Sequence, residues 1–427
     1  MPVLQLNASA QSLNDSEISL DKAISLALEN NLNLKKSEID LAASGYSEKK
    51  LFAEIFPSIN AAASIGYRNA FFSGITPAGS GLNYSTGFGI SLGLNAGIPY
   101  AIKNIKLAHQ GNILKYEDAR NQLSILVTRK FYSLIAEKTN LVLLEEILGL
   151  AQRQHERDQV SFRNGLVREL VVIQGKLAVE NARYNLSTAS TSYANNMSEF
   201  LATLGLSGGE ITLKGGLSIV RISVDAEDLI NRHLSGRPDI ARSRQEIERL
   251  EYSQKQSLIA GRAPSLNLSM DWNISNLNPY SDTFSGTARL SIPIDPWIPG
   301  TAKNQSFSRA NDSTEKAKLD LTIAEESAKT QIRSLASLLH NFWDSIAIAR
   351  LSLEAAQRSY ELTEQGFRSG TVESLALEDA RNNMANAKQR LLQTELSYFS
   401  MILDLSSALN LDWKKLIEDF GVQGEKK

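Results

Sequence analysis

Four segments of the chain alternate apolar and polar side chains with a period of two. The strongest places Tyr84, Thr86, Phe88, Ile90, Leu92, Leu94, Ala96 and Ile98 on one face, opposite small and polar residues. The apolar faces of the other three consist of Ile59, Ala61, Ala63, Ile65 and Tyr67; Leu266, Leu268, Met270, Trp272 and Ile274; and Phe284, Ala288, Leu290 and Ile292. This period predicts four β-strands. The Gly-, Pro- and Asn-rich loops Asn69 to Asn83 and Ser275 to Asp282 join them as two hairpins.

Two other segments predict long, uninterrupted helices. No glycine or proline occurs from Ala302 to Gln365, and the segment from Tyr100 to Arg163 contains no proline. Apolar residues of the former alternate spacings of four and three, as in a coiled-coil seam, along Leu335, Leu339, Phe342, Ile346, Ala349, Leu353, Ala356 and Tyr360. Each helix would extend roughly 90 Å. Four shorter helices, at about 20–55, 167–204, 226–262 and 372–409, come in pairs that match one long helix, and we expect them to stack end to end.

The second half of the chain repeats the first. The turn sequence from Phe162 to Val167 recurs as the segment from Phe367 to Val372, and the register holds through the following helix. Upstream, Pro57 and Pro264 each open a strand after a helical stretch. The repeat predicts two tandem copies of one unit that consists of a helix, a hairpin and two further helices.

The predicted strands form a sheet that is incomplete within one chain. Strands of about 9 to 11 residues with one apolar and one polar face are typical of a membrane β-barrel, although a soluble sandwich strand has the same pattern. The two hairpins have no other sheet in the chain on which to pack. Four strands cannot close a barrel, because about eight is the smallest number. Closure therefore requires several chains, and the pattern does not fix how many.

Composition excludes several function classes. The net charge of −2 provides no basic surface for nucleic acid, and the absence of cysteine excludes thiolate metal sites, thiol nucleophiles and a lipidated cysteine. The four histidines lie far apart without metal-ligand spacing, and no phosphate-binding loop or nucleophile elbow occurs. No run of about 18 apolar residues predicts a transmembrane helix. We expect no enzyme and no cofactor.

The pattern divides the chain into nine segments. The start, from Met1 to Ala10, ends in a small-x-small pattern that we interpret as a trimmed signal peptide, with a disordered N-terminus as the alternative. The segments are 1–16, this N-terminus; 17–56, a helix; 57–99, a hairpin; 100–204, a helical hairpin; 205–225, a linker with small strands; 226–263, a helix; 264–299, a hairpin; 300–410, a helical hairpin; and 411–427, a C-terminal tail.

These features together resemble the TolC-like outer-membrane factor family over about Glu17 to Trp413. The resemblance rests on the repeat, the strand exits Ile98-Pro99 and Ile292-Pro293 into long helices, and the two Phe-Arg-x-Gly turns. It implies a mainly α fold with a membrane β-barrel: a homotrimer with a twelve-stranded β-barrel, a twelve-helix α-barrel of long coiled-coil helices and an equatorial domain formed by 205–225 and 411–427.

The resemblance also implies a location in the outer membrane, extending into the periplasm, and passive conduction of drugs, small molecules or proteins. The implied partners are outer-membrane lipid, a periplasmic membrane-fusion adaptor and an inner-membrane pump or ABC transporter. Multidrug export and type I secretion use different partner proteins, and this sequence does not indicate which of them this chain would bind.

The resemblance also assigns candidate residues. The tip turns that meet the adaptor would be Gly165, Leu166 and Val167, and Gly370, Thr371 and Val372. In the protein that gives the family its name, two acidic residues three positions apart narrow the pore. Here those positions are Ala376 and Asp379, with Glu373 and Glu378 close enough to replace part of the missing charge. The alternative is that these carboxylates only complement a helix N-terminus.

A structural coiled-coil protein is the alternative from another class. Such a periplasmic scaffold or adhesin stalk would carry the hairpins as small β-caps, and would stay monodisperse without detergent. Dependence on detergent therefore distinguishes the two.

Overall fold

The computed structural model describes residues 17–68, 81–206, 208, 211–275 and 281–422. The chain forms two compact units: one contains 1–38, 116–238 and 325–427, and the other contains 39–115 and 239–324. The long helices α3 (Ile98–Arg163) and α7 (Ala302–Arg368) have residues in both units, as does the shorter α2 (Leu32–Lys49). The predicted N-terminal remnant and most of the two predicted hairpin loops lie outside the described residues.

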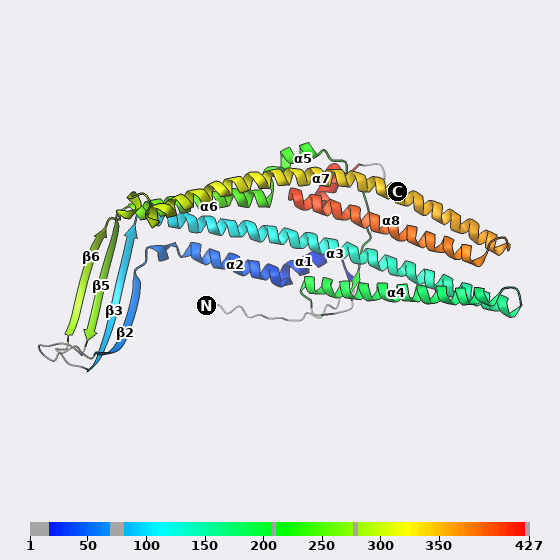
Figure 1. Cartoon of the computed structure of the whole chain (residues 1–427), viewed down its shortest axis with the longest axis horizontal. Helices are drawn as coiled ribbons and strands as arrows, with labels where there is room; N and C mark the ends of the chain where they lie inside the picture. The colour runs from blue at the N-terminus through cyan, green and yellow to red at the C-terminus, as the bar shows by residue number, and fades with distance from the viewer. Residues whose placement is uncertain (1–16, 69–80, 207, 209–210, 276–280, 423–427) are drawn as a thin grey trace. The chain divides into compact units, whose positions relative to one another are not determined.

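The second unit contains an antiparallel sheet in the order β2-β3-β5-β6 (Figure 1). Its strands are β2 (Ser58–Arg68), β3 (Gly81–Asn95), β5 (Ser265–Ser275) and β6 (Ser281–Ser291). Pairing of β3 with β5 joins the two hairpins, so that the two halves of the sequence repeat contribute equally. Strands β2 and β6 are the outer strands of the described sheet.

The strand register keeps the predicted faces intact. Phe88 lies between Ala61 and Trp272, and Trp272 lies beside Phe284, so that one row of the apolar face crosses all four strands. On the opposite face, polar side chains of one strand lie over glycines of its neighbour. Asn60 of β2 covers Gly89 of β3, where an added Cβ would lie 2.6 Å from the Asn60 Oδ1 atom. The larger apolar side chains on the first face, including Phe88, Trp272 and Phe284, are exposed in the single chain.

Besides the sheet, the second unit contains most of α2 (Leu32–Lys49), nearly all of α6 (Pro238–Arg262) and the adjoining turns of α3 and α7. Short 3-10 turns lie before β2 (η1, Leu51–Glu54) and after β6 (η3, Asp295–Trp297).

The first unit consists of two helical hairpins with equivalent cores. In one, α3 packs on α1 (Leu20–Asn30) and α4 (Glu169–Leu204) through a cluster that contains Phe131 and Phe200. In the other, α7 packs on α8 (Ser374–Leu409) through Leu339, Ile346 and Ile402. Similar apolar positions in the two repeats therefore form similar cores, as the coiled-coil spacing predicts.

The predicted single helices 17–56 and 226–263 are both interrupted, which corrects the sequence-based prediction. Asn31 separates α1 from α2: its side chain donates to the Thr203 carbonyl and accepts from the backbone N–H groups of Asn33 and Leu34. The second helix is divided into α5 (Ala226–His233), the 3-10 turn η2 (Leu234–Gly236) and α6. Here Arg237 is buried and its guanidinium donates to the Ala408 carbonyl.

The linker 205–225 contains a small strand, as predicted: β4 (Thr212–Leu213) pairs in parallel with β1 (Glu17–Ile18). Strand β1 itself lies at the start of the segment 17–56, which was expected to be helical. Further along the linker, Ile222 forms only an isolated bridge to Gly421. The segment expected as a tail contains α9 (Trp413–Phe420).

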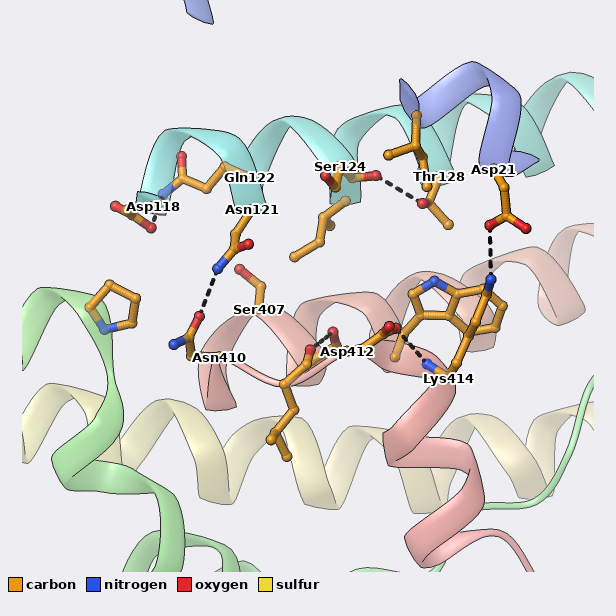
Figure 2. Close-up of a pocket in the computed structure, with 16 residues that line it drawn as sticks. Asp21, Asp118, Asn121, Gln122, Ser124, Thr128, Ser407, Asn410, Asp412 and Lys414 are labelled. Carbon is orange, nitrogen blue, oxygen red and sulfur yellow. Dashed lines mark hydrogen bonds and ion pairs between the residues drawn. The ribbon is translucent and has the colours of Figure 1, made fainter. Parts of the chain in front are cut away.

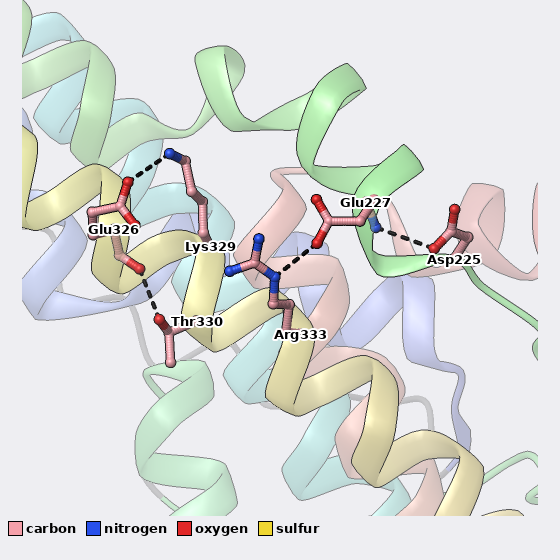
Figure 3. Close-up of polar contacts among 6 residues, drawn as sticks. All are labelled: Asp225, Glu227, Glu326, Lys329, Thr330 and Arg333. Atoms are coloured by element: carbon pink, nitrogen blue, oxygen red, sulfur yellow. Dashed lines mark hydrogen bonds and ion pairs between the residues drawn. The ribbon is translucent and has the colours of Figure 1, made fainter.

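Polar contacts fix these peripheral elements to the helical core. The Tyr398 hydroxyl of α8 donates to the Val220 carbonyl and accepts from the Ile222 N–H at 2.9 Å. Helix α5 lies against α7, where the Arg333 guanidinium donates to Glu227 at 2.8 Å (Figure 3). The linker between the two repeats is thereby attached to the second helical hairpin.

Candidate functional site

The two turns between paired helices have the same backbone geometry. Between α3 and α4, Gly165 has a φ of 72°, and the Leu166 N–H donates to the Ser161 carbonyl at 2.8 Å. Between α7 and α8, Gly370 has a φ of 75°, and the Thr371 N–H donates to the Gly366 carbonyl at 2.9 Å. A left-handed residue that closes the last helical turn in this way is favourable for glycine and strained for other residues.

The exposed side chains at the two turns are different. Leu166 is 75% exposed and Val167 is partly exposed, and further exposed apolar residues, Leu170, Ile173 and Leu177, follow along α4 with coiled-coil spacing. At the second turn Thr371 is exposed but its hydroxyl donates to the Gly366 carbonyl, and Val372 covers Gly366. Leu166 of the first turn is therefore replaced by the polar Thr371 at the second, although Leu375 of α8 is exposed close to the second turn.

The three predicted acidic residues lie in three environments at the start of α8. Glu373 is the exposed N-cap residue and makes no side-chain capping hydrogen bond. Asp379 is exposed. Glu378 is half-buried and lines a groove of about 500 Å³ between the two helical hairpins.

Two charged residues that sequence reasoning missed lie in the same groove. Asp158 of α3 is 3% exposed and Arg381 of α8 is 7% exposed. Asp158 accepts a hydrogen bond from Gln154 at 2.8 Å through one carboxylate oxygen. Its other oxygen and Nε of Arg381 are buried without a hydrogen-bond partner among the described residues. Gly175 of α4 makes room for this carboxylate, because a Cβ there would approach it to 3.0 Å.

Burial changes the protonation of this cluster. Burial raises the pKa of Asp158, against the opposing effects of its Gln154 hydrogen bond and of nearby cationic groups. Burial also raises the pKa of Glu378; the Arg381 guanidinium opposes this, while Asp379 and Asp158 add to it. As the pH falls, both carboxyl groups therefore take up a proton at a higher pH than usual. Asp379, next to Glu378 in the sequence, is exposed to solvent, as is Glu373.

A second pocket of about 350 Å³ lies in the same unit, where α8 and α9 meet α1 and α3 (Figure 2). Its polar groups largely satisfy one another: the Lys414 ammonium lies 2.9 Å from Asp21, and the Asn121 amide donates to Asn410. Asn410 takes the left-handed conformation that ends α8. We interpret this pocket as a packing contact between helices and not as a ligand-binding site.

The described residues contain no group of three or more histidine, aspartate or glutamate residues placed to hold a metal ion. Within the same residues, none of the helices combines the length and apolar character needed to cross a membrane.

The sequence matches the family described as "Outer membrane efflux protein" over residues 23–206 and 229–411. The chain belongs to this family. Each matched range contains one copy of the tandem repeat, with one β-hairpin and one helical hairpin. The predicted family is thereby confirmed, and with it the fold of an outer-membrane efflux channel, with long helices and a β-barrel to which each chain contributes four strands.

Individual relatives agree with the family match. The probable efflux pump outer membrane protein TtgC and the antibiotic efflux pump outer membrane protein ArpC, both from Pseudomonas putida, are each 25% identical over 414 residues. These matches cover 92% of this chain and 83% of either relative.

Solved channels have the same fold. The CmeC outer membrane channel of Campylobacter jejuni superimposes with a TM-score of 0.74 at 19% identity, covering 94% of this chain and 88% of CmeC. The open state of the MtrE outer membrane channel of Neisseria gonorrhoeae gives a TM-score of 0.72 at 14% identity, covering 92% and 89%. These relatives are named as channels and efflux components. The family match favours an efflux channel over the scaffold or adhesin stalk.

Proposed function

We propose that three copies of this chain form the outer-membrane channel of a tripartite export system. The observation that supports this most strongly is the four-stranded sheet with an exposed apolar face and with β2 and β6 as its outer strands. Three such sheets, joined through these outer strands, would supply twelve strands, which is enough to close a barrel. An apolar face that is exposed in the chain is then covered by lipid.

The predicted division of the chain gives each segment a place in this assembly. Segments 57–99 and 264–299 would cross the outer membrane, and 100–204 and 300–410 would form the periplasmic tube. The segments 205–225 and 411–427 would form an equatorial layer around it.

The helix turns are the proposed contact with a periplasmic adaptor. Gly165, Leu166 and Val167 would form the more apolar contact, and Gly370, Thr371 and Val372 the more polar one, because Thr371 stands where the first turn has Leu166. The adaptor would connect the channel to an inner-membrane pump or ABC transporter. Because the relative ArpC is named for antibiotic efflux, small drug-like molecules are the proposed cargo.

The proposed constriction is a ring of three Asp379 carboxylates at the narrow end of the tube. Exposure of Asp379 in the single chain supports this role, because a pore-lining residue must remain accessible. Glu373 would add charge near the entrance, and Glu378 would contribute less, because it faces the groove that contains Arg381.

Reconstitution in a planar lipid bilayer tests the proposal. The purified protein should produce discrete conductance steps that prefer cations over anions, as expected for a pore narrowed by carboxylates. A scaffold or stalk would leave the bilayer silent. A trimeric, detergent-solubilised preparation that inserts into the bilayer but never conducts would contradict the channel function.

A further inference from the structure

The polar face of the four-stranded sheet contains very few charged residues. Along the described strands β2, β3, β5 and β6, this face consists of glycine, alanine, serine, threonine and asparagine, with three exceptions: Arg68, Asp271 and Arg289. Arg68 is the last residue of β2, at the end of the sheet where the hairpin loops lie. Asp271 and Arg289 are therefore the charges within the body of the described sheet.

These two residues lie at different heights on neighbouring strands. Asp271 of β5 is paired with Ser285 of β6. Arg289, four residues farther along β6, is exposed and is paired with Asn267. This separation corresponds to about 13 Å along the strands, and no ion pair joins the two residues within the described sheet. The cation thus lies nearer to the end at which β6 leads into α7, and the anion lies farther toward the hairpin loops.

A glycine on the next strand sets the position of the Asp271 carboxylate. An added Cβ at Gly89 of β3 would lie 2.8 Å from the Asp271 Oδ1 atom and 2.6 Å from the Asn60 Oδ1 atom. The two side chains therefore lie over β3 from its two neighbouring strands, in space that a larger residue than glycine would occupy. The carboxylate accordingly lies along the wall of the sheet.

A barrel of twelve such strands would enclose a water-filled lumen. With neighbouring strands about 4.8 Å apart and tilted by about 40°, the radius of the backbone is about 12 Å, and the small side chains of this face fill little of it. Charges at the wall then lie about one Debye length from the axis at 0.1 M salt, but about three Debye lengths from it at 1 M salt. A ring of three charges should therefore change ion concentrations on the axis by about twofold at 0.1 M salt, and hardly at all at 1 M.

We infer that Arg289 and Asp271 form two opposed charge rings in the lumen of the barrel, which select ions independently of the constriction at Asp379. The inference rests on the proposed function, because only a closed trimer gathers three copies of each residue around one axis. An ion that leaves the tube would meet the arginines first, where anions are favoured, and then the aspartates, where cations are favoured. Because the rings carry equal and opposite charge, their effects on overall selectivity nearly cancel, and each effect appears when the other ring is removed.

Reversal potentials of single channels in a KCl gradient test the two rings. The measurements use the Asp379→Ala background, which removes the carboxylate ring of the constriction. At about 0.1 M salt, Arg289→Gln should raise the permeability ratio of K⁺ to Cl⁻ by about twofold or more, because the aspartate ring then acts alone. Asp271→Asn should lower the ratio by a similar factor. The two substitutions together should restore the ratio of the background, and at 1 M salt all these differences should vanish.

Two further variants guard against effects on the barrel itself. Ser285→Asn is the matched control, because Ser285 is paired with Asp271 on the same face and the substitution changes size without changing charge. It should leave the permeability ratio unchanged. Asn267→Asp adds a carboxylate beside Arg289 without removing the arginine, and should raise the ratio as Arg289→Gln does. This variant still tests the arginine ring if Arg289→Gln does not insert into the bilayer.

The outcomes separate the rings from the channel function. If Arg289→Gln and Asp271→Asn shift the ratio in the same direction, or if their effects persist at 1 M salt, they act by distorting the barrel and the rings are refuted. If both variants conduct with the ratio of the background at about 0.1 M salt, the rings have no role in selectivity, while the channel function stands. A native protein that never conducts would instead contradict the proposed function itself.

Discussion

Leu92→Arg or Leu268→Arg should destabilise the membrane-inserted protein by about 2 to 4 kcal/mol, the cost of a cation on the lipid face near the bilayer midplane. The two leucines are direct neighbours on β3 and β5, and both lie on the apolar face of the sheet. Urea titration of the protein folded in phospholipid vesicles measures the change in the free energy of unfolding.

A matched control is available one residue away. Ser269 lies beside Leu268 at nearly the same depth, but on the polar face of the sheet, between Ser91 and Thr287. Ser269→Arg should therefore cost much less than either leucine variant, because its side chain would extend into the water-filled interior. Equal losses at the three positions would mean that both faces of the sheet meet the same medium, and the barrel would be wrong.

Asp379→Ala should remove most of the cation preference of the reconstituted channel. In a trimer, three Asp379 carboxylates would converge on the axis, and a narrow pore concentrates their field. Block by trivalent cations should weaken in parallel. Conversely, Ala376→Asp should strengthen both properties, because it adds three further carboxylates one helical turn away. Single-channel recording of reversal potentials and of block measures both effects.

Two variants make this experiment specific. Asp320→Ala removes an exposed carboxylate from α7 in the other unit, and should leave selectivity unchanged. Glu378→Gln should have a smaller effect than Asp379→Ala, because Glu378 lies in the groove beside Arg381 and its pKa is raised. If Asp379→Ala conducts with unchanged selectivity and block, this carboxylate is only a charge near a helix start, and the assigned constriction is wrong.

Local patterns allowed much of the fold to be predicted. The period of two fixed the four strands and their faces, because every second residue must meet the same medium. The tip turns were also visible, since Gly165 and Gly370 need no distant partner to favour a left-handed conformation. A small strand was predicted in the linker that contains β4, but its partner β1 was missed, because a two-residue strand has no period.

The interruptions of the helices depend on residues far away in sequence. Asn31 ends α1 by bonding the carbonyl of Thr203, and Arg237 enters the core to bond that of Ala408. Neither partner is apparent before the chain is folded. The groove cluster was missed for the same reason, although one signal was present. Arg381 lies between Leu377 and Ala385 at spacings of four, so a charge occupies the buried stripe of α8.

Closure of the sheet between copies of the chain is the central claim, and cysteine cross-linking tests it most directly. The natural chain has no cysteine, so every disulfide must come from the introduced residues. Ala61→Cys in β2 is combined in turn with Phe284→Cys, Gly286→Cys, Ala288→Cys and Leu290→Cys in β6, all on the same face of the sheet. One of these pairs, at the register set by the neighbouring copy, should give a covalent trimer after mild oxidation in the membrane, and no single-cysteine variant should exceed a dimer. If all four pairs remain monomeric, or form only ladders without a limit at three chains, then β2 and β6 do not close a trimeric barrel.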